Sequence, residues 1–227
     1  MDEPSFDVCN HNPSTGETTM STAEQFDFYS VNAYLAAEEL ATTRSEFVNG
    51  RIRSMAGATN RHNTVAVNVL VSFGRQLAGH ACRPFNSDTK IRVRHGEATW
   101  FYYPDASIVC ESNRATETFQ DRPVVVIEVL SQSTRAIDLD EKLTAYLSIE
   151  SLQVYVLLEQ DKPYAIAMRR TPAGFLREVY EGLAAVVALT TVGCTLSLDE
   201  VYSGVEFAPA TVQEPTATYE ASERDPL

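Results

Sequence analysis

Residues 124–130, VVVIEVL, constrain the fold most, because six of these seven side chains are apolar and the fifth is Glu128. Such a run is typical of a strand that lies in the core of a protein. A carboxylate at the end of an apolar strand is costly unless another group pairs with its charge. The sequence therefore predicts that another part of the chain supplies a partner for Glu128.

Length and composition indicate one soluble domain. With 227 residues, of which 44% are hydrophobic, the chain is long enough for one well-filled core and too short for two large ones. It has no apolar run of the about 18 residues that a membrane span needs, and it has no secretion signal at its start. We therefore expect a cytoplasmic protein that does not associate with a membrane.

The cysteines point to the same compartment. They are widely separated, and no pair has the short spacing of a zinc ribbon or a redox motif. In a reducing compartment such cysteines stay reduced. We therefore predict free thiols for Cys9, Cys82, Cys110 and Cys194.

Negative charge is concentrated at the two ends of the chain. The formal net charge is -13, yet residues 1–30 carry six carboxylates with no Lys or Arg, and residues 208–227 carry four carboxylates with one Arg. Without these ends, about -4 remains for residues 31–207. The ends are also rich in Ser, Thr, Pro and Ala, so we predict disordered acidic tails around a single domain of residues 31–207. That domain has no basic stripe of the kind typical of tight DNA binding.

Hydrophobic periodicity and turn signals predict a mixed α/β fold. The order helix, three strands, helix, strand is typical of a mixed sheet flanked by helices, here with a β-hairpin added at each side. Asn49-Gly50 is the strongest hairpin signal, and Asn60 is predicted to cap a long helix that Gly79 stops. The predicted helices cover residues 31–42, 60–78 and 133–148, and the predicted strands cover residues 82–93, 100–110, 122–130, 152–159, 164–169 and 176–180.

Two carboxylates stand out in consecutive predicted strands. Asp105 closes the sequence FYYPD in the middle of one strand, and Glu128 lies at a comparable depth in the next. If the two strands are neighbours, the carboxylates converge, and such a pair suits a hard cation such as Mg²⁺ or Mn²⁺. The alternative is structural: Asp105 begins a turn, and Glu128 forms a salt bridge with Arg122 or Arg92.

A lysine in the following helix favours a functional site. This helix carries Asp138, Lys142 and Tyr146 four residues apart, so the three side chains share one face. The start of the helix lies above the carboxyl end of the preceding strand, where α/β sheets usually hold their sites. Lys142 could orient or deprotonate a water there and offset charge on a phosphate. The alternative is an exposed Asp138–Lys142 pair on a solvated helix face.

Four segments taken together resemble the Uma2 family. They are SEFVNGRI, AGATNRHN, YYPDASIVC and VVVIEVLSQSTRAIDLDEKLTAYL, and they occur in the family's order within residues 31–200. Uma2, also called DUF820, is a family of restriction-endonuclease-like proteins in the PD-(D/E)XK nuclease superfamily. The resemblance implies the restriction-endonuclease-like core of that superfamily and the activity of a metal-dependent endonuclease.

The resemblance also implies a set of site residues. The wider superfamily places a lysine two residues after its second acid, where this chain has Leu130. Lys142 is similar to the lysine that replaces it in Uma2, and an ammonium on a flexible stem can reach the same point from another element. The groups implied to hold Mg²⁺ are Asp105, Glu128, the backbone carbonyl of Val129 and, as a ligand of the metal or its water, Glu46.

Three further residues are candidates for supporting roles. His62 matches a histidine of the family and is a candidate for a part in catalysis. A histidine in the first turn of a helix more often packs against its neighbours or caps the helix. Lys90 lies in a strand that is similar to the family's SDxK-like strand, and it points either into the site or to the surface. Asp138 is predicted to steady Lys142 rather than to bind the metal.

The leading hypothesis is a Mg²⁺-dependent endonuclease that hydrolyses phosphodiester bonds of DNA. Its predicted catalytic residues are Glu46, Asp105, Glu128 and Lys142. One alternative is a catalytically idle nuclease fold that works as a binding or regulatory module. Another is an interaction protein whose hairpins cover each other's sheet edges in a homodimer. We expect a homodimer in either case and no small-molecule cofactor.

Overall fold

The computed structural model describes residues 28–55 and 57–207. The predicted acidic tails fall outside these ranges, apart from residues 28–30, which precede the first helix. No helix of the described part is long and apolar enough to cross a membrane. The helices are α1 (Val31–Leu40), α2 (Asn60–Gln76), α3 (Arg135–Leu139), α4 (Glu141–Leu147) and α5 (Leu198–Val201), with a 3₁₀ turn at Thr190–Val192.

The strands form two larger sheets and a separate hairpin. The six-stranded sheet is mixed and has the order β11-β10-β9-β8-β6-β3, in which β8 runs parallel to β9. The five-stranded sheet has the order β2-β1-β5-β4-β7. The bounds are β1 Ser45–Val48, β2 Arg51–Ser54, β3 Arg83–Asn86, β4 Lys90–His95, β5 Ala98–Tyr102, β6 Ala106–Val109, β7 Phe119–Gln120, β8 Pro123–Leu130, β9 Val154–Glu159, β10 Tyr164–Thr171, β11 Gly174–Glu181, β12 Val186–Leu189 and β13 Cys194–Ser197.

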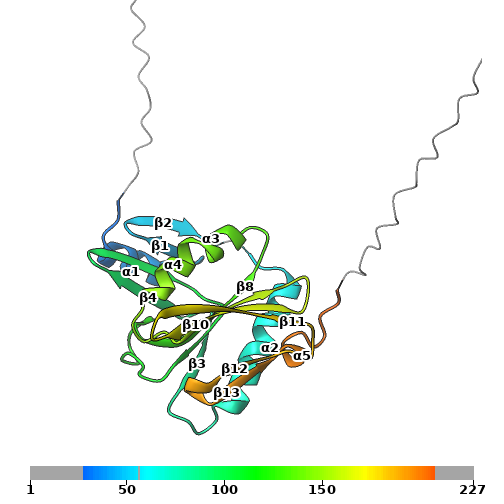
Figure 1. Ribbon diagram of the computed structural model, residues 1–227. Helices are drawn as coiled ribbons and strands as arrows, with labels where there is room; N and C mark the ends of the chain where they lie inside the picture. The colour runs from blue at the N-terminus through cyan, green and yellow to red at the C-terminus, as the bar shows by residue number, and fades with distance from the viewer. Residues whose placement is uncertain (1–27, 56, 208–227) are drawn as a thin grey trace, which may run out of the picture.

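The six-stranded sheet is the middle layer of the molecule. Figure 1 shows α2, α5 and the β12–β13 hairpin on one side of it, and α1, α3, α4 and the five-stranded sheet on the other. A sheet covered on both faces needs apolar side chains on both faces of its central strands. This arrangement explains the nearly continuous apolar sequence of β8.

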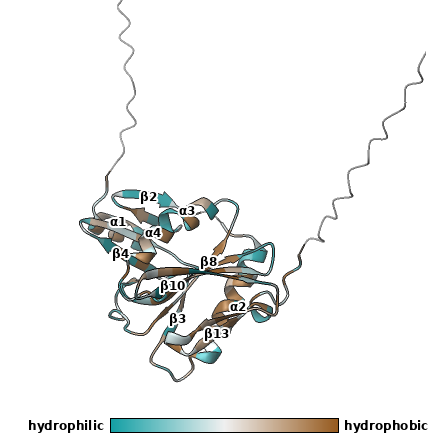
Figure 2. Cartoon of the chain, viewed as in Figure 1, coloured by the Kyte–Doolittle hydropathy of each residue, from teal (hydrophilic) through white to brown (hydrophobic). Residues whose placement is uncertain are grey.

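The residues of β8 alternate between two hydrophobic clusters. Val125 and Ile127 pack in the cluster that includes α2 and the β12–β13 hairpin. Val126 and Leu130 pack in the cluster that includes α4 and β4. Because successive strand side chains point to opposite faces, Glu128 shares the face of Val126 and Leu130 and points toward α4. Figure 2 shows brown, hydrophobic colour along β8, whereas the outer strand β2 is largely teal.

The predicted hairpin at Asn49-Gly50 is confirmed. Strands β1 and β2 pair in antiparallel fashion, with Val48 opposite Arg51 and Glu46 opposite Arg53. Both turn residues have positive φ, 45° at Asn49 and 93° at Gly50, as a two-residue turn of the I′ type requires. The turn therefore fixes which residues of the two strands face each other.

Two of the predicted strands are wrong in extent. Residues 82–93 form β3 and β4, which belong to different sheets, and residues 100–110 form β5 and β6, which also belong to different sheets. Asp105 therefore lies at the crossing between the sheets, directly before β6, and not in the middle of a strand. Pro104 has no N–H for a strand ladder, which suits a position where the chain leaves one sheet for another.

The predicted helix ends also need correction. Thr59, not Asn60, caps α2, since its hydroxyl accepts a hydrogen bond from the backbone N–H of His62 at 3.2 Å. The predicted helix of residues 133–148 is broken at Asp140 into α3 and α4. At the break, Asp140 has a non-helical backbone with φ -128° and ψ -76°. Beside it, the hydroxyl of Tyr155 donates to the backbone carbonyl of Asp138 at 3.1 Å, which a continuous helix would bond to the N–H of Lys142.

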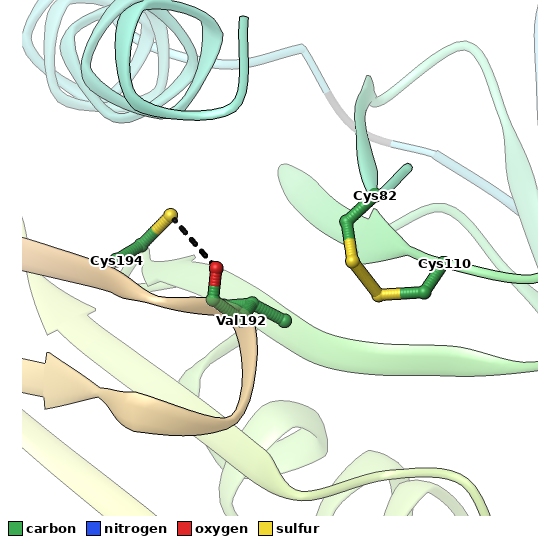
Figure 3. Close-up of a disulfide and its surroundings, with 4 residues drawn as sticks. All are labelled: Cys82, Cys110, Val192 and Cys194. Atoms are coloured by element: carbon green, nitrogen blue, oxygen red, sulfur yellow. Dashed lines mark hydrogen bonds between the residues drawn. A yellow bond between two sulfur atoms is a disulfide. The ribbon is translucent and has the colours of Figure 1, made fainter. Parts of the chain in front are cut away.

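The prediction of free thiols is wrong for two cysteines. Cys82 and Cys110 form a disulfide, which Figure 3 shows apart from the free, buried Cys194. The pairing of β3 with β6 brings the two cysteines together, because Arg83 lies opposite Val109 and the cysteines are the next residues outward. Cys9 lies outside the described residues. The predicted free thiols had supported a reducing compartment, and the disulfide takes that support away. The cytoplasmic location stays a prediction.

Candidate functional site

Asp105 and Glu128 lie together where β6 and β8 pair. The two strands are antiparallel neighbours, with Ala106 opposite Ile127, so Asp105 and Glu128 are the next facing positions. The Oδ2 atom of Asp105 accepts a hydrogen bond from the backbone N–H of Val129 at 2.7 Å. The two strands are thus neighbours, as the predicted convergence of the two carboxylates requires.

Lys142 of α4 is the partner of Glu128. Its Nζ lies 3.0 Å from Glu128 Oε1, and both side chains are buried. The hydroxyl of Tyr146, one helical turn later, donates to the same oxygen at 3.2 Å. Arg92 and Arg122, the alternative partners, pair with other carboxylates. The costly charge in the apolar strand is therefore compensated by a buried ammonium.

The ammonium of Lys142 faces two further carboxylates. Its Nζ lies 3.0 Å from Glu46 Oε1 and 3.2 Å from Asp138 Oδ1. Asp138 and Lys142 are both buried, so the alternative of an exposed pair is wrong. Burial by itself lowers the pKa of Lys142, but the surrounding carboxylates outweigh it and hold that pKa well above its ordinary value. A lysine in this state orients groups and offsets negative charge, and it does not take up a proton.

The carboxylates around this ammonium are short of positive charge. Burial raises the pKa of Glu128 well above its ordinary value, and the neighbouring Asp138, Asp105 and Glu46 raise it further against the opposing effect of Lys142. Burial likewise raises the pKa of Asp138. One ammonium therefore does not balance the cluster, and an additional cation would stabilise its ionised form.

Glu46 lies behind Lys142, where the first hairpin holds it. Its Oε2 accepts hydrogen bonds from Arg53 Nη2 at 2.7 Å and from Arg53 Nε at 3.1 Å. The same guanidinium donates to the carboxylate of Glu141, at 2.9 Å and 3.2 Å. Arg53 was not among the residues predicted from the sequence, although the two-residue turn at Asn49-Gly50 already places it opposite Glu46. Counting outward from the turn would have found it.

A pocket of about 900 Å³ opens at this site. Within the described residues, its lining includes neither Glu46 nor Lys90, and the only guanidinium in it belongs to Arg44. No group of three or more His, Cys, Asp or Glu side chains in that part of the chain is arranged to hold a metal ion. The site residues that line the pocket are His62, Asp105, Glu128, Val129, Asp138 and Lys142.

His62 reaches the site from the first turn of α2. Its Nε2 lies 3.3 Å from Asp105 Oδ2. Burial lowers the pKa of His62, but the Asp105 carboxylate and the Val129 backbone carbonyl raise it, and the net shift is upward. The histidine thus touches a predicted metal ligand rather than only packing in the helix, while its part in catalysis stays a prediction.

Lys90 is buried next to the pocket and not on the surface. Its Nζ lies 5.3 Å from the centre of the Tyr103 ring, and Tyr103 itself lines the pocket. Burial lowers the pKa of Lys90. The structure therefore places this lysine behind an aromatic wall of the pocket rather than in it.

Comparison with known proteins gives the family. Residues 31–199 match the model of a family described as "Uma2: Putative restriction endonuclease". The chain belongs to the Uma2 family. This Uma2 chain is also 32% identical over 130 residues to the uncharacterized protein sll1609 of Synechocystis sp., a stretch that covers 56% of this chain and 72% of that protein. It is 28% identical over 188 residues to the uncharacterized protein slr1290 of the same organism, which covers 82% of this chain and 98% of the relative.

A solved structure supports the fold of this Uma2 chain. It is a crystal structure described as that of a putative nuclease belonging to DUF820 from Anabaena variabilis. The TM-score is 0.58 at 17% sequence identity, and the likeness covers 72% of this chain and 92% of the other. The predicted fold, a mixed α/β core with a central sheet flanked by helices, is confirmed.

Proposed function

We propose that this protein is a nuclease that hydrolyses phosphodiester bonds of DNA with Mg²⁺ or Mn²⁺ as its metal ion. One observation carries the proposal: Asp105, Glu128 and the ammonium of Lys142 line the same pocket, and the lysine is held protonated there. Membership in a family described as "Putative restriction endonuclease" supports the same chemistry.

The donor atoms in the pocket fit a hard divalent cation. Only Oδ2 of Asp105 and only Oε1 of Glu128 have partners within the described residues, so Oδ1 and Oε2 can bind a metal. The carbonyl of Val129 faces the same place, next to His62. Two carboxylates and a carbonyl leave coordination positions for water, which Mg²⁺ usually retains.

Glu46 is a poor candidate for a direct metal ligand in this conformation. Its two oxygens are engaged by Lys142 and Arg53, and it does not line the pocket within the described residues. It would have to release one of these partners before it could bind a metal. We therefore assign the metal to Asp105, Glu128 and Val129.

The protein's own residues would prepare the substrate. A divalent cation held by Asp105, Glu128 and the Val129 carbonyl would supply positive charge at the scissile phosphate and would make a bound water more acidic. Lys142 adds a second, permanent positive charge from the floor of the pocket, where it can orient the phosphate. Arg44, on the pocket wall and 46% exposed, pairs with Asp88 and would have to share its guanidinium with a flanking phosphate.

Substitution of the two carboxylates tests the proposal. We expect Asp105→Asn and Glu128→Gln to reduce Mg²⁺-dependent or Mn²⁺-dependent DNA cleavage at least ~100-fold, since each removes a charged ligand. Asp121→Asn is a matched control, because Asp121 is also a half-buried, ion-paired carboxylate but lies outside the pocket. Cleavage by Asp105→Asn at the wild-type rate, with the fold intact by circular dichroism, would show that the proposal is wrong.

One observation favours a second candidate, an idle nuclease fold that works as a binding or regulatory module. Lys142 contacts Glu46, Glu128 and Asp138, so a residue of the chain itself compensates buried carboxylates of the site. Calorimetric titration of Mn²⁺ into wild type and Asp105→Asn separates the candidates. Binding that is lost in the variant supports the nuclease, whereas no binding to either protein supports the idle module.

A further inference from the structure

We propose that Arg53 is a positioning residue, which holds Glu46 against Lys142 and so fixes the Lys142 ammonium at the floor of the pocket. The placement of the ammonium follows from the contacts among Arg53, Glu46 and Lys142. Its consequence for catalysis rests on the proposed function. The chain of contacts runs from the outer strand β2, through β1, to α4.

The guanidinium of Arg53 is a bridge between the first hairpin and α4. It donates two hydrogen bonds to one oxygen of Glu46 and two to the carboxylate of Glu141, which directly precedes Lys142. The hydroxyl of Tyr102 donates to Glu141 at 3.0 Å, which anchors the same carboxylate from β5. The backbone of α4 next to Lys142 is thus tied to two strands of the five-stranded sheet.

Glu46 transmits this anchoring to the lysine itself. One of its oxygens receives Arg53, and the other lies 3.0 Å from the Nζ of Lys142. Because Glu46 does not line the pocket within the described residues, it acts on a substrate through Lys142. The contact between Glu46 and Lys142 is an ion pair in a buried environment, where charge attraction is weakly screened, so it holds the ammonium close to Glu46.

Charge balance gives Arg53 a second effect. Without this guanidinium, Glu46 would be a buried carboxylate that pairs, among the described residues, only with an ammonium that it shares with Glu128 and Asp138. Glu46 would then no longer be held in place, and the lysine would lose one fixed counter-ion. Neutralisation of Glu46 by Arg53 leaves the ammonium directed at the carboxylates that line the pocket.

The small number of lysines makes Lys142 directly observable. The chain contains only Lys90, Lys142 and Lys162, so ¹⁵N-lysine labelling gives three side-chain ammonium signals in the nuclear magnetic resonance spectrum of wild type and one more in that of Arg53→Lys. We would record them for wild type, Arg53→Met and Arg53→Lys in the absence of added metal. Arg169→Met is the matched control, because Arg169 is 22% exposed and pairs with a single carboxylate, Glu178, on the distant β10–β11 hairpin.

We expect the hydrogen exchange of the Lys142 ammonium to become at least ~10-fold faster in Arg53→Met, while the Lys90 signal stays unchanged. Arg53→Lys should restore part of the protection, because it returns the charge but not the forked bonding. Arg169→Met should leave the Lys142 signal as in wild type. An unchanged Lys142 signal in folded Arg53→Met would overturn the inference.

Nuclease assays on the same variants separate this inference from the proposed function. If both hold, Arg53→Met lowers kcat about 10-fold and changes KM little, since binding contacts remain. If wild type shows no cleavage but the Lys142 signal responds as described, the proposed function fails and the positioning role stands. A change in nuclease activity without any change at Lys142 would count against the positioning role.

Discussion

Single residues at the site are coupled through one ammonium. Lys142 lies within 3.2 Å of carboxylate oxygens from Glu46, Glu128 and Asp138, and all four side chains are buried. Among the described residues, Glu128 and Asp138 pair with no other cation, whereas Glu46 also pairs with Arg53. When one partner of a buried ion pair is removed, the other is left as an uncompensated buried charge. The resulting loss in the free energy of unfolding is usually larger than the net contribution of the intact pair.

Replacement of Lys142 should therefore destabilise the fold. We expect Lys142→Met to lower the free energy of unfolding by about 3–5 kcal/mol at pH 7, measured by urea denaturation. Adding Glu128→Gln should recover part of the loss, since it removes one of the stranded charges. The deficit should also shrink as the pH falls, because the raised pKa values of Glu128 and Asp138 favour their protonation in the folded state.

The exposed Lys162 provides the control for this experiment, and Lys162→Met should change stability by less than about 0.5 kcal/mol. A Lys142→Met protein as stable as wild type at pH 7 would mean that the three carboxylates do not need the ammonium.

Among the structural elements, a salt bridge ties the short strand β7 to β4. Asp121 directly follows β7, and its carboxylate accepts bonds from Arg92 Nε at 2.7 Å and from Arg92 Nη2 at 2.8 Å. The amide of Asn113 donates to the same carboxylate at 3.0 Å. Although partial burial raises it, these donors hold the pKa of Asp121 below its ordinary value of 3.8. The ionised form of Asp121 therefore stabilises the fold.

This pKa shift predicts how Asp121→Asn depends on pH. A lowered pKa in the folded state adds stability above the ordinary pKa, and that stability is lost as the pH falls through the folded value. We expect Asp121→Asn to lower the free energy of unfolding by about 1–2 kcal/mol at pH 7 and by progressively less below about pH 4. Denaturation curves for both proteins between pH 2.5 and 7 measure the difference. A difference that grows toward low pH would contradict this assignment.

Element types were more predictable than element boundaries. The hairpin at Asn49-Gly50 and the strand of residues 124–130 follow from local signals, a turn that needs positive φ and an apolar run. The break at Asp140 does not, because it accompanies a bond from Tyr155, a residue in another strand. The division of residues 100–110 between two sheets is likewise decided by tertiary packing.

At the scale of the whole molecule, the disulfide closes a loop of the sheet that carries Asp105. Cys82 and Cys110 are 28 residues apart in sequence, and chain-entropy arguments give such a cross-link about 3–4 kcal/mol of stabilisation. Its strands β3 and β6 form the edge of the six-stranded sheet next to β8. The disulfide thus restrains the side of the sheet on which the site is built.

We expect reduction of this disulfide, or the variant Cys82→Ser with Cys110→Ser, to lower the Tm by several degrees without loss of the fold. Thermal unfolding with and without dithiothreitol measures the change, and the double variant should not respond to the reductant. Mass spectrometry that found both thiols free in the native protein would contradict the pairing.

The homodimer stays a prediction, since the contacts within the described part of one chain do not test it.

The sequence by itself determined the elements whose causes are local, and the resemblance of four segments pointed to the family. It also drew attention to Asp105 and Glu128 as a candidate pair, because acidic residues beside apolar strands stand out along the chain. It also placed Lys142 on the right helix face. Only the tertiary structure decided which charges meet: that Glu46 and Asp138 share the ammonium with Glu128, that Arg53 holds Glu46, and that two distant cysteines pair. The physical reason is that ion pairing and burial depend on distances between elements, which sequence spacing does not contain.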